Sequence, residues 1–174
     1  NIPKGSHVYL GNSLPIREWD LAACQEDRKL EITASRGMYG IDGQIATFLG
    51  LCRSETQNWA ILGDLTALYD MAGCWGLSLI EAAEISIVII NNGGGKIFER
   101  MFPHPEMLNQ HGLSFEPLAR MWGLPYQCLK DGINGVCSES RQLIEIIPDH
   151  LATQRFWSKL TSIKEELVCC RPKV

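Results

Sequence analysis

Asp64 and Asn92 are the two side chains whose types and spacing most suggest chemistry. Asp64 closes the apolar run "NWAILGD" (58–64), and Asn92 closes "ISIVIINN" (85–92). About one helix plus one strand separates them, which is the spacing of two adjacent parallel strand ends joined by a crossover. Their oxygens suit a hard cation such as Mg2+, which prefers octahedral oxygen coordination and usually retains phosphate oxygens and water. The pair, with Asn91 beside it, therefore predicts a metal site.

Three glycines follow the asparagines in "INNGGGKIF" and extend this hypothesis to a phosphate group. Their flexible backbone can turn carbonyls toward a cation and amides toward an anion. The segment "LTALYD" after Asp64 opens a candidate helix, whose free N–H groups favour a phosphate. Taken singly, each feature keeps a simpler interpretation: a helix cap, a turn or a loosened loop. Taken together, at this spacing, they favour a site for a metal and a diphosphate.

Two other glycine-rich phosphate sites are excluded by the residues present. A P-loop would need Ser or Thr after Gly95-Lys96 and a glycine five residues before Gly95, but Ile97 and Ile90 stand there. The G-x-G-x-x-G dinucleotide fingerprint is also absent from the sequence.

The composition limits the class of protein. The 174 residues, 45% of them hydrophobic, are enough for a single core of ordinary size. A net charge of -4 and a pI near 5.6 argue against a broad nucleic-acid surface. No apolar stretch reaches the length of a membrane span and no leader starts the chain, so we expect a soluble, cytoplasmic protein. The seven cysteines form no C-x-x-C pair, which favours reduced thiols over disulfides or a zinc site.

Short apolar runs alternate with helical segments along the chain. We expect strands within 7–13, 29–35, 58–64, 85–92, 125–129 and 141–148, and helices at 15–25, 44–54, 67–83 and 115–124. Gly73 and Gly76 weaken the third helix by roughly 1 kcal/mol each. The last helix is the clearest, because Asp149 offers an N-cap. Its apolar positions recur with helical spacing at Phe156, Leu160, Ile163 and Leu167.

This alternation predicts one α/β domain, a three-layer parallel sheet with helices on both faces. In such a sheet, ligands bind outside the carboxyl ends of the strands. The loop after Leu10, the loop "SRGMYGIDG" (35–43), and the segments after Asp64 and Asn92 all fall at these ends. We therefore expect them to share one site.

The same segments carry a family resemblance. "GDLTALYD" followed by "INNGGG" resembles the G-D-x…N-N signature of thiamin-diphosphate enzymes. Together with "SRGMYGIDG" and "NNGGGKIF", it resembles more specifically the C-terminal cofactor domain of the 2-succinyl-5-enolpyruvyl-6-hydroxy-3-cyclohexene-1-carboxylate synthase family. The resemblance runs from about "LGNSLPIRE" to "LIEIIPD", most of the chain. It implies a thiamin-diphosphate-binding fold in which residues 1–174 form the diphosphate-binding module, the C-terminal part of a longer enzyme.

The resemblance also implies roles for individual residues. It makes Asp64, Asn92 and the backbone carbonyl of Gly94 ligands of Mg2+ or Mn2+, with two diphosphate oxygens and a water completing the octahedron. Ile41 in "GIDG" matches the apolar residue that props the cofactor in its bent conformation. The implied cofactor contacts are Ile41, Gly63, Asp64, Leu65, Thr66, Asn92, Gly94 and Ile97. Positions that line the substrate pocket are matched by Ser13, Arg17, Arg36, Ile97 and Phe98.

The implied reaction belongs to menaquinone biosynthesis. In the family, 2-oxoglutarate is decarboxylated on the cofactor and the resulting succinyl-semialdehyde unit is added to isochorismate, a transferase reaction. Both substrates are carboxylates, and the planar guanidinium of arginine binds carboxylates in bidentate fashion, which fits Arg17 and Arg36. Either arginine could instead be a solvated or structural charge.

No catalytic residue is expected in this chain, because the family's essential glutamate lies in an N-terminal pyrimidine-binding domain that the chain does not contain. That domain, a middle domain and a second subunit of a homodimer or homotetramer are the implied partners, and the isolated chain is expected to be inactive. The segments after Phe98 and after Tyr126 are shorter than is usual in the family. Two alternatives stay open: another thiamin-diphosphate decarboxylase or carboligase, and a non-catalytic module for diphosphate binding or assembly.

Overall fold

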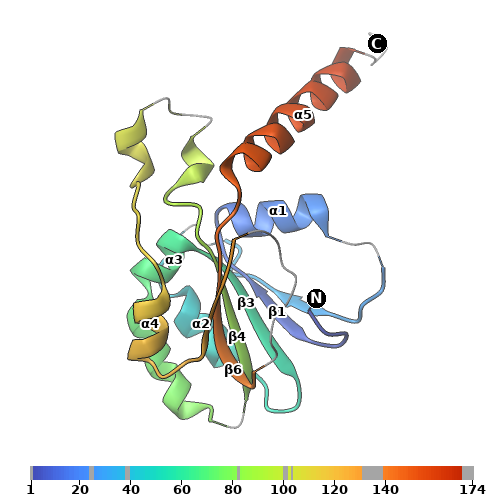
Figure 1. Ribbon diagram of the computed structural model, residues 1–174. Helices are drawn as coiled ribbons and strands as arrows, with labels where there is room; N and C mark the ends of the chain where they lie inside the picture. Colours follow the sequence, from blue (N-terminus) through green and yellow to red (C-terminus); the bar gives the residue numbers. More distant parts are fainter. Residues whose placement is uncertain are drawn as a thin grey trace.

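The fold is seen in a computed structural model that describes residues 2–23, 26–37, 40–81, 83–99, 102, 104–130 and 139–169, the last three without their side chains. Much of the two shortened segments, at 100, 101, 103 and 131–138, therefore lies outside the described residues. The strands are β1 (His7–Leu10), β2 (Glu31–Thr33), β3 (Gln57–Gly63), β4 (Glu84–Ile90), β5 (Tyr126–Leu129) and β6 (Arg141–Ile146). They form one parallel sheet (Figure 1), in which the strand order is β2-β1-β3-β4-β6-β5. The predicted parallel α/β class is confirmed.

Strands β3 and β4 form the centre of the sheet and pair along their whole length. Gln57 pairs with Glu84 and Gly63 pairs with Ile90. Strand β4, "EISIVII", is buried from its second to its sixth residue, as expected for a β-branched run covered on both faces of a parallel sheet. The register brings the two strands to an end at the same level, so the segments that begin at Asp64 and Asn91 leave the sheet side by side.

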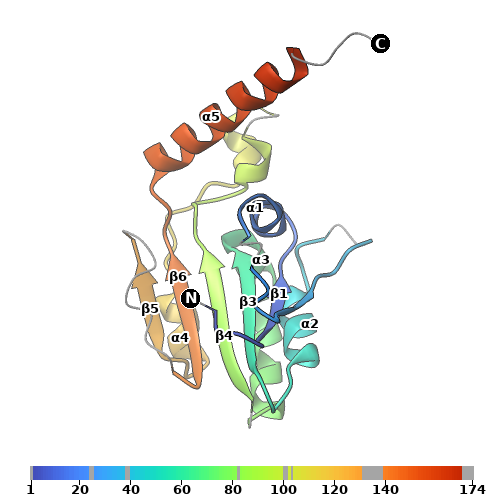
Figure 2. The same ribbon diagram turned by 90° about the vertical axis from the view of Figure 1, so that its right-hand side faces the viewer.

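Helices cover both faces of the sheet, as predicted. One face carries α2 (Gln44–Leu51), α3 (Asp64–Tyr69), the 3-10 helix η1 (Met71–Leu79) and α4 (Glu116–Met121). The core between them and the sheet contains Tyr9, Phe48, Ile87, Phe115 and Leu143. On the other face, Ile16 and Trp19 of α1 (Leu14–Ala22) pack against the cluster of Val8, Leu10, Trp59 and Val88. Helix α1 lies near the carboxyl ends of the strands (Figure 2).

The helix expected at 67–83 is the main correction to the predicted elements. The structure has α3 from Asp64 to Tyr69 and then the 3-10 helix η1, which ends at Leu79. Glycine allows η1 to pack closely on α2, because a Cβ at Gly73 would lie 2.9 Å from the nitrogen of Ala46, and one at Gly76 would lie 3.0 Å from Cδ1 of Leu49. The two glycines thus serve the contact between η1 and α2.

Helix α5 (His150–Cys169) is present as predicted, but it extends away from the sheet (Figures 1 and 2). Oδ1 of Asp149 accepts a hydrogen bond from the nitrogen of Ala152 at 2.6 Å, which confirms the predicted N-cap. The apolar face does not pack on the sheet, since Phe156 and Ile163 are 49% and 42% exposed.

Two further expectations concern cysteines and membranes. Cys52, Cys74 and Cys128 are free thiols, as predicted for these three, whereas Cys24, Cys137 and Cys170 lie outside the described residues. None of the helices in the described part of the chain combines the length and the apolarity needed to cross a lipid bilayer.

Candidate metal and diphosphate site

Asp64 lies where β3 ends and α3 begins. Gly63, the residue before it, is extended and forms the N-cap, so the carboxylate emerges in the first turn of the helix beside the loop that follows β4. Only 3% of Asp64 is exposed. A carboxylate buried to this extent requires hydrogen-bond donors or a cation close by.

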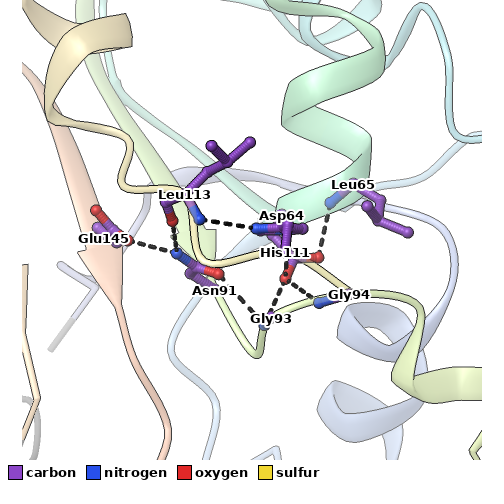
Figure 3. Close-up of polar contacts among 8 residues, drawn as sticks. All are labelled: Asp64, Leu65, Asn91, Gly93, Gly94, His111, Leu113 and Glu145. Carbon is purple, nitrogen blue, oxygen red and sulfur yellow. Dashed lines mark hydrogen bonds and ion pairs between the residues drawn. The ribbon is translucent and has the colours of Figure 1, made fainter. Parts of the chain in front are cut away.

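The loop of glycines supplies those donors (Figure 3). Oδ2 of Asp64 accepts hydrogen bonds from the backbone nitrogens of Gly93 and Gly94 at 2.8 and 2.9 Å. Oδ1 accepts one from the nitrogen of Leu65 at 2.7 Å. The predicted convergence of Asp64 with the segment after Asn92 is therefore present. Oδ1 is the less engaged of the two oxygens and has a lone pair left for a cation.

The loop needs glycine at its centre. Gly93 and Gly94 have φ values of +81° and +139°, which side-chain-bearing residues rarely adopt. A Cβ on Gly94 would also lie 2.6 Å from the carbonyl oxygen of Leu108, at the end of η3 (Pro105–Leu108). The same carbonyl accepts a hydrogen bond from the nitrogen of Gly95 at 2.5 Å. Chain 108–111 thus packs directly on the loop and holds its shape.

His111 is a close neighbour of Asp64 that the sequence reasoning missed. Its Nδ1 accepts a hydrogen bond from the nitrogen of Leu113 at 3.3 Å, so in this arrangement the ring proton belongs on Nε2. Nε2 makes no hydrogen bond but lies 3.4 Å from Oδ2 of Asp64. The imidazole therefore presents its N–H edge to the carboxylate that the glycine amides also hold.

Asn91 and Asn92 have different environments. Nδ2 of Asn91 donates to Oε1 of Glu145 at 2.6 Å and to the carbonyl of Leu113 at 2.8 Å, and Oδ1 of Asn91 accepts from Gly93 at 3.3 Å. Oδ1 of Asn92 is buried and has no hydrogen-bond partner. Because buried acceptors are nearly always paired, this unsatisfied oxygen indicates a missing partner such as a metal ion.

Glu145 anchors Asn91 from strand β6. It is fully buried, and its Oε2 accepts hydrogen bonds from the nitrogen of Phe115 at 3.0 Å, the hydroxyl of Tyr126 at 2.5 Å and the hydroxyl of Ser114 at 3.4 Å. Burial by itself would raise the pKa of the Glu145 carboxyl. The four hydrogen bonds donated to the carboxylate have the larger combined effect, so the pKa lies below its ordinary value. Glu145 is therefore an anion inside the protein.

A cleft of about 1430 Å³ opens beside this region, between α1, the loop after β4 and the first half of α5. Three of the predicted site residues, Arg17, Asn92 and Ile97, line it. Lys96 lines it as well, at the start of η2 (Lys96–Phe98), and its Nζ lies 2.7 Å from Oε1 of Glu99. The cleft thus joins a candidate metal ligand to two cationic side chains.

Three other predicted residues lie in the loops that follow β1 and β2, namely Ser13, Arg36 and Ile41. Arg36 donates from Nη1 to Oδ1 of Asn12 at 3.4 Å, and Nδ2 of Asn12 donates to the carbonyl of Gly40, next to Ile41. The carbonyl of Ser13 accepts a hydrogen bond from Nη1 of Arg17 at 2.6 Å. Among the described residues, Ser13, Arg36, Ile41 and Phe98 are not part of the cleft lining. The structure therefore leaves these four residues outside the lining of the cleft that Asn92 shares.

The residues present fit a divalent metal. Among the described residues, no three His, Cys, Asp or Glu side chains cluster as a metal site, so a cation would require a mixed set of oxygen ligands. Asp64 offers a buried carboxylate, Asn92 a buried oxygen without a partner, and Gly94 a carbonyl that accepts one hydrogen bond, from Lys96 at 2.8 Å. Such a donor set is typical for Mg2+ or Mn2+ rather than for zinc.

Comparison with known proteins identifies relatives over most of the chain. No family model matches the chain. The 2-succinyl-5-enolpyruvyl-6-hydroxy-3-cyclohexene-1-carboxylate synthase of Bdellovibrio bacteriovorus is 44% identical over 166 residues, covering 94% of this chain and 32% of the relative. The proteins of the same name from Akkermansia muciniphila and Roseiflexus sp. are 35% and 38% identical, covering 91% and 75% of this chain and 32% and 24% of the relatives. The chain thus spans about a third or less of the length of these curated relatives.

Proposed function

This chain belongs to the 2-succinyl-5-enolpyruvyl-6-hydroxy-3-cyclohexene-1-carboxylate synthase family, and we propose that it is the part of such an enzyme that binds the diphosphate of thiamin diphosphate through Mg2+ or Mn2+. The observation that carries the proposal is the buried, unpaired Oδ1 of Asn92 in the loop whose amides hold Asp64. Asp64, Asn92 and the carbonyl of Gly94 would hold the metal. Gly63, Leu65, Thr66, Ile41 and Ile97 would contact the cofactor.

When bound, thiamin diphosphate supplies a thiazolium ring that stabilises the charge left by decarboxylation of a 2-oxo acid. The residues of this chain would bind the cofactor and orient it. The amides of Gly93 and Gly94 hold the carboxylate of Asp64 in place. Arg17 and Lys96 provide positive charge at the cleft for substrate carboxylates. Ser13, Arg36 and Phe98 would complete the substrate pocket.

The proposed substrates are 2-oxoglutarate and isochorismate, and the proposed product is the family's menaquinone precursor. No catalytic residue is proposed in this chain. The activating glutamate would come from an N-terminal pyrimidine-binding domain of the same enzyme, in a homodimer or homotetramer that also contains a middle domain. We propose that this assembly works in the cytoplasm.

A thermal-shift titration tests the metal and diphosphate site. A ligand that binds only the folded state raises stability by mass action, by about 2.7 kcal/mol at a hundred times its Kd. We expect thiamin diphosphate to stabilise the protein only when Mg2+ is present, and we expect Asp64→Asn and Asp64→Ala to abolish this effect. Asp20→Ala, at an exposed position of α1, is the matched control and should behave as wild type.

If the isolated chain shows no stabilisation, the titration is repeated on the complete enzyme. Failure there as well would overturn the proposed site. On the complete enzyme, turnover with 2-oxoglutarate and isochorismate is compared with turnover of other 2-oxo acids. A preference for another pair of substrates would replace the proposed reaction with that of a different thiamin-diphosphate enzyme.

A further inference from the structure

Glu145 has no role in the proposed chemistry, yet it is a fully buried charged side chain at the centre of a polar network. A buried carboxylate is costly unless several donors surround it. Four donors surround Glu145 here. Ser114 and Phe115 precede α4, Tyr126 lies in β5, and the fourth donor is Asn91. A hydrophobic residue at this position of β6 would avoid the free-energy cost of burying a charge, so the presence of Glu145 requires another explanation.

The two oxygens of Glu145 serve different parts of the structure. Oε2 accepts from Ser114, Phe115 and Tyr126, which hold the start of α4 and strand β5. Oε1 accepts from Nδ2 of Asn91 at 2.6 Å, the contact that leads toward the metal site. The carboxylate therefore joins the protein core to the Asn-Asn turn through one oxygen.

Two routes lead on from Asn91 to Asp64 (Figure 3). In the first, the nitrogen of Gly93 lies within hydrogen-bond distance of both Oδ1 of Asn91 and Oδ2 of Asp64, at 3.3 and 2.8 Å. In the second, Nδ2 of Asn91 donates to the carbonyl of Leu113, the nitrogen of Leu113 donates to Nδ1 of His111, and Nε2 of His111 faces Oδ2 of Asp64. Both routes end on the same carboxylate oxygen.

We propose that Glu145 is a positioning residue for the metal, acting through Asn91 on the glycine loop and on the 111–113 segment. This inference rests on the proposed function. With Asn91 held inward by Glu145, the turn leaves Oδ1 of Asn92 unpaired. Oδ2 of Asp64 is occupied by protein donors, while Oδ1 stays available. Glu145 thereby fixes the two oxygens that the cation needs before the cation arrives.

Glu145→Gln tests this link with minimal change of shape. An amide nitrogen in place of Oε1 would face Nδ2 of Asn91, donor against donor, while the oxygen in place of Oε2 keeps its three donors. Rotating the amide of Asn91 does not repair the clash, because its oxygen would then face the carbonyl of Leu113. Tyr126→Phe is the matched control, since it removes a donor from Oε2 and leaves the contact between Oε1 and Asn91 intact.

The measurement is a Mn2+ titration of the complete enzyme with thiamin diphosphate present, in which electron paramagnetic resonance counts free Mn2+. Mutating partners of metal ligands typically weakens metal binding 10- to 100-fold, so we expect Glu145→Gln to raise the Kd for Mn2+ about tenfold or more. We expect Tyr126→Phe to lower stability but to change this Kd less than about twofold. Asn91→Ala should weaken Mn2+ binding as Glu145→Gln does, and the double variant should be no weaker than either single one.

Unchanged Mn2+ affinity in both Glu145→Gln and Asn91→Ala, or an equal loss in Tyr126→Phe, would overturn the positioning role and leave Glu145 a residue of the fold alone. Asn91→Ala decides the question if Glu145→Gln does not fold. A wild-type enzyme that binds no Mn2+, or an Asp64→Asn variant that binds it as wild type does, would overturn the proposed function and this inference with it.

Discussion

Asn91 and Asn92 are consecutive, but their carboxamide oxygens lie in opposite environments. Asn91 contacts Glu145, Leu113 and Gly93, whereas Oδ1 of Asn92 is buried without a partner. An unsatisfied buried acceptor costs about 1–3 kcal/mol, so Asn92 is a source of local instability unless a partner reaches its Oδ1. The instability lies where a cation would remove it.

Replacing Asn92 should therefore separate stability from metal binding. We expect Asn92→Leu to raise the free energy of unfolding in EDTA by about 1 kcal/mol, because the unpaired oxygen is removed. The same variant should lose the stabilisation by Mg2+ and thiamin diphosphate. Asn91→Leu is the control and should lower the free energy of unfolding by about 2 kcal/mol, since it leaves Oε1 of Glu145 without its donor. Urea unfolding in EDTA measures both, and a loss of stability in Asn92→Leu would contradict this account.

Gly94 should tolerate no side chain. Gly94→Ala places a Cβ 2.6 Å from the carbonyl oxygen of Leu108 in a backbone conformation with φ +139°, so we expect a loss of roughly 2–3 kcal/mol in unfolding free energy. Gly112→Ala is the matched control nearby, because its Cβ would meet no atom within 4 Å. Urea unfolding should show little change for Gly112→Ala. Equal effects of the two substitutions would show that the loop does not need the conformation observed.

The pH dependence of stability should carry a contribution from Glu145. The pKa of Glu145 in the folded protein lies below its ordinary value of 4.5, so its stabilisation is fully present above that value and is lost as the pH falls through the lower, folded pKa. Glu145→Gln has no such titration. The difference in unfolding free energy between wild type and Glu145→Gln should therefore be constant near pH 7 and shrink as the pH falls below 4.5. A difference that grows on acidification would contradict the lowered pKa.

Cys52 and Cys74 should be unreactive in the folded protein. Burial raises the pKa of both thiols to about 12, and the thiolate is the reactive form. We expect neither to be labelled by iodoacetamide at about pH 8 until the chain is unfolded in urea. Mass spectrometry of labelled peptides identifies each cysteine. Rapid labelling of Cys74 in the native protein would show that the packing of η1 opens easily.

The sheet and the meeting of Asp64 with the glycine loop could be predicted because both follow from local signals. Continuous β-branched runs identify β3 and β4, and the ends of neighbouring parallel strands lie at one edge. The unbroken helix expected at 67–83 was wrong, because Gly73 and Gly76 serve a contact with α2, which lies elsewhere in the sequence. Propensity alone carries no information about such a contact.

The residues that hold the candidate metal ligands in place were harder to predict from the sequence. Glu145 stands among apolar residues in "QLIEII", and a lone acid at an inward position of a strand is a signal that could have marked it. His111 and Asn91 carry no comparable signal, since a single histidine in a polar stretch is common and an Asn-Asn pair does not reveal which member turns inward. Long-range hydrogen bonds decide these roles, and one sequence does not show them.

The strand order has a consequence for folding kinetics. The contact between Asn91 and Glu145 joins residues that are 54 positions apart in the sequence. Strand β4 lies between β3 and β6 in the sheet, so its pairing is complete only when β6, the last strand in the sequence, has joined. Chains dominated by such distant pairings fold slowly, because the entropy of closing long loops is lost before the contacts form. We therefore expect the Asn-Asn turn to gain its final shape late in folding. Metal affinity should rise late in a refolding reaction, and bound metal would then report that the whole sheet is complete.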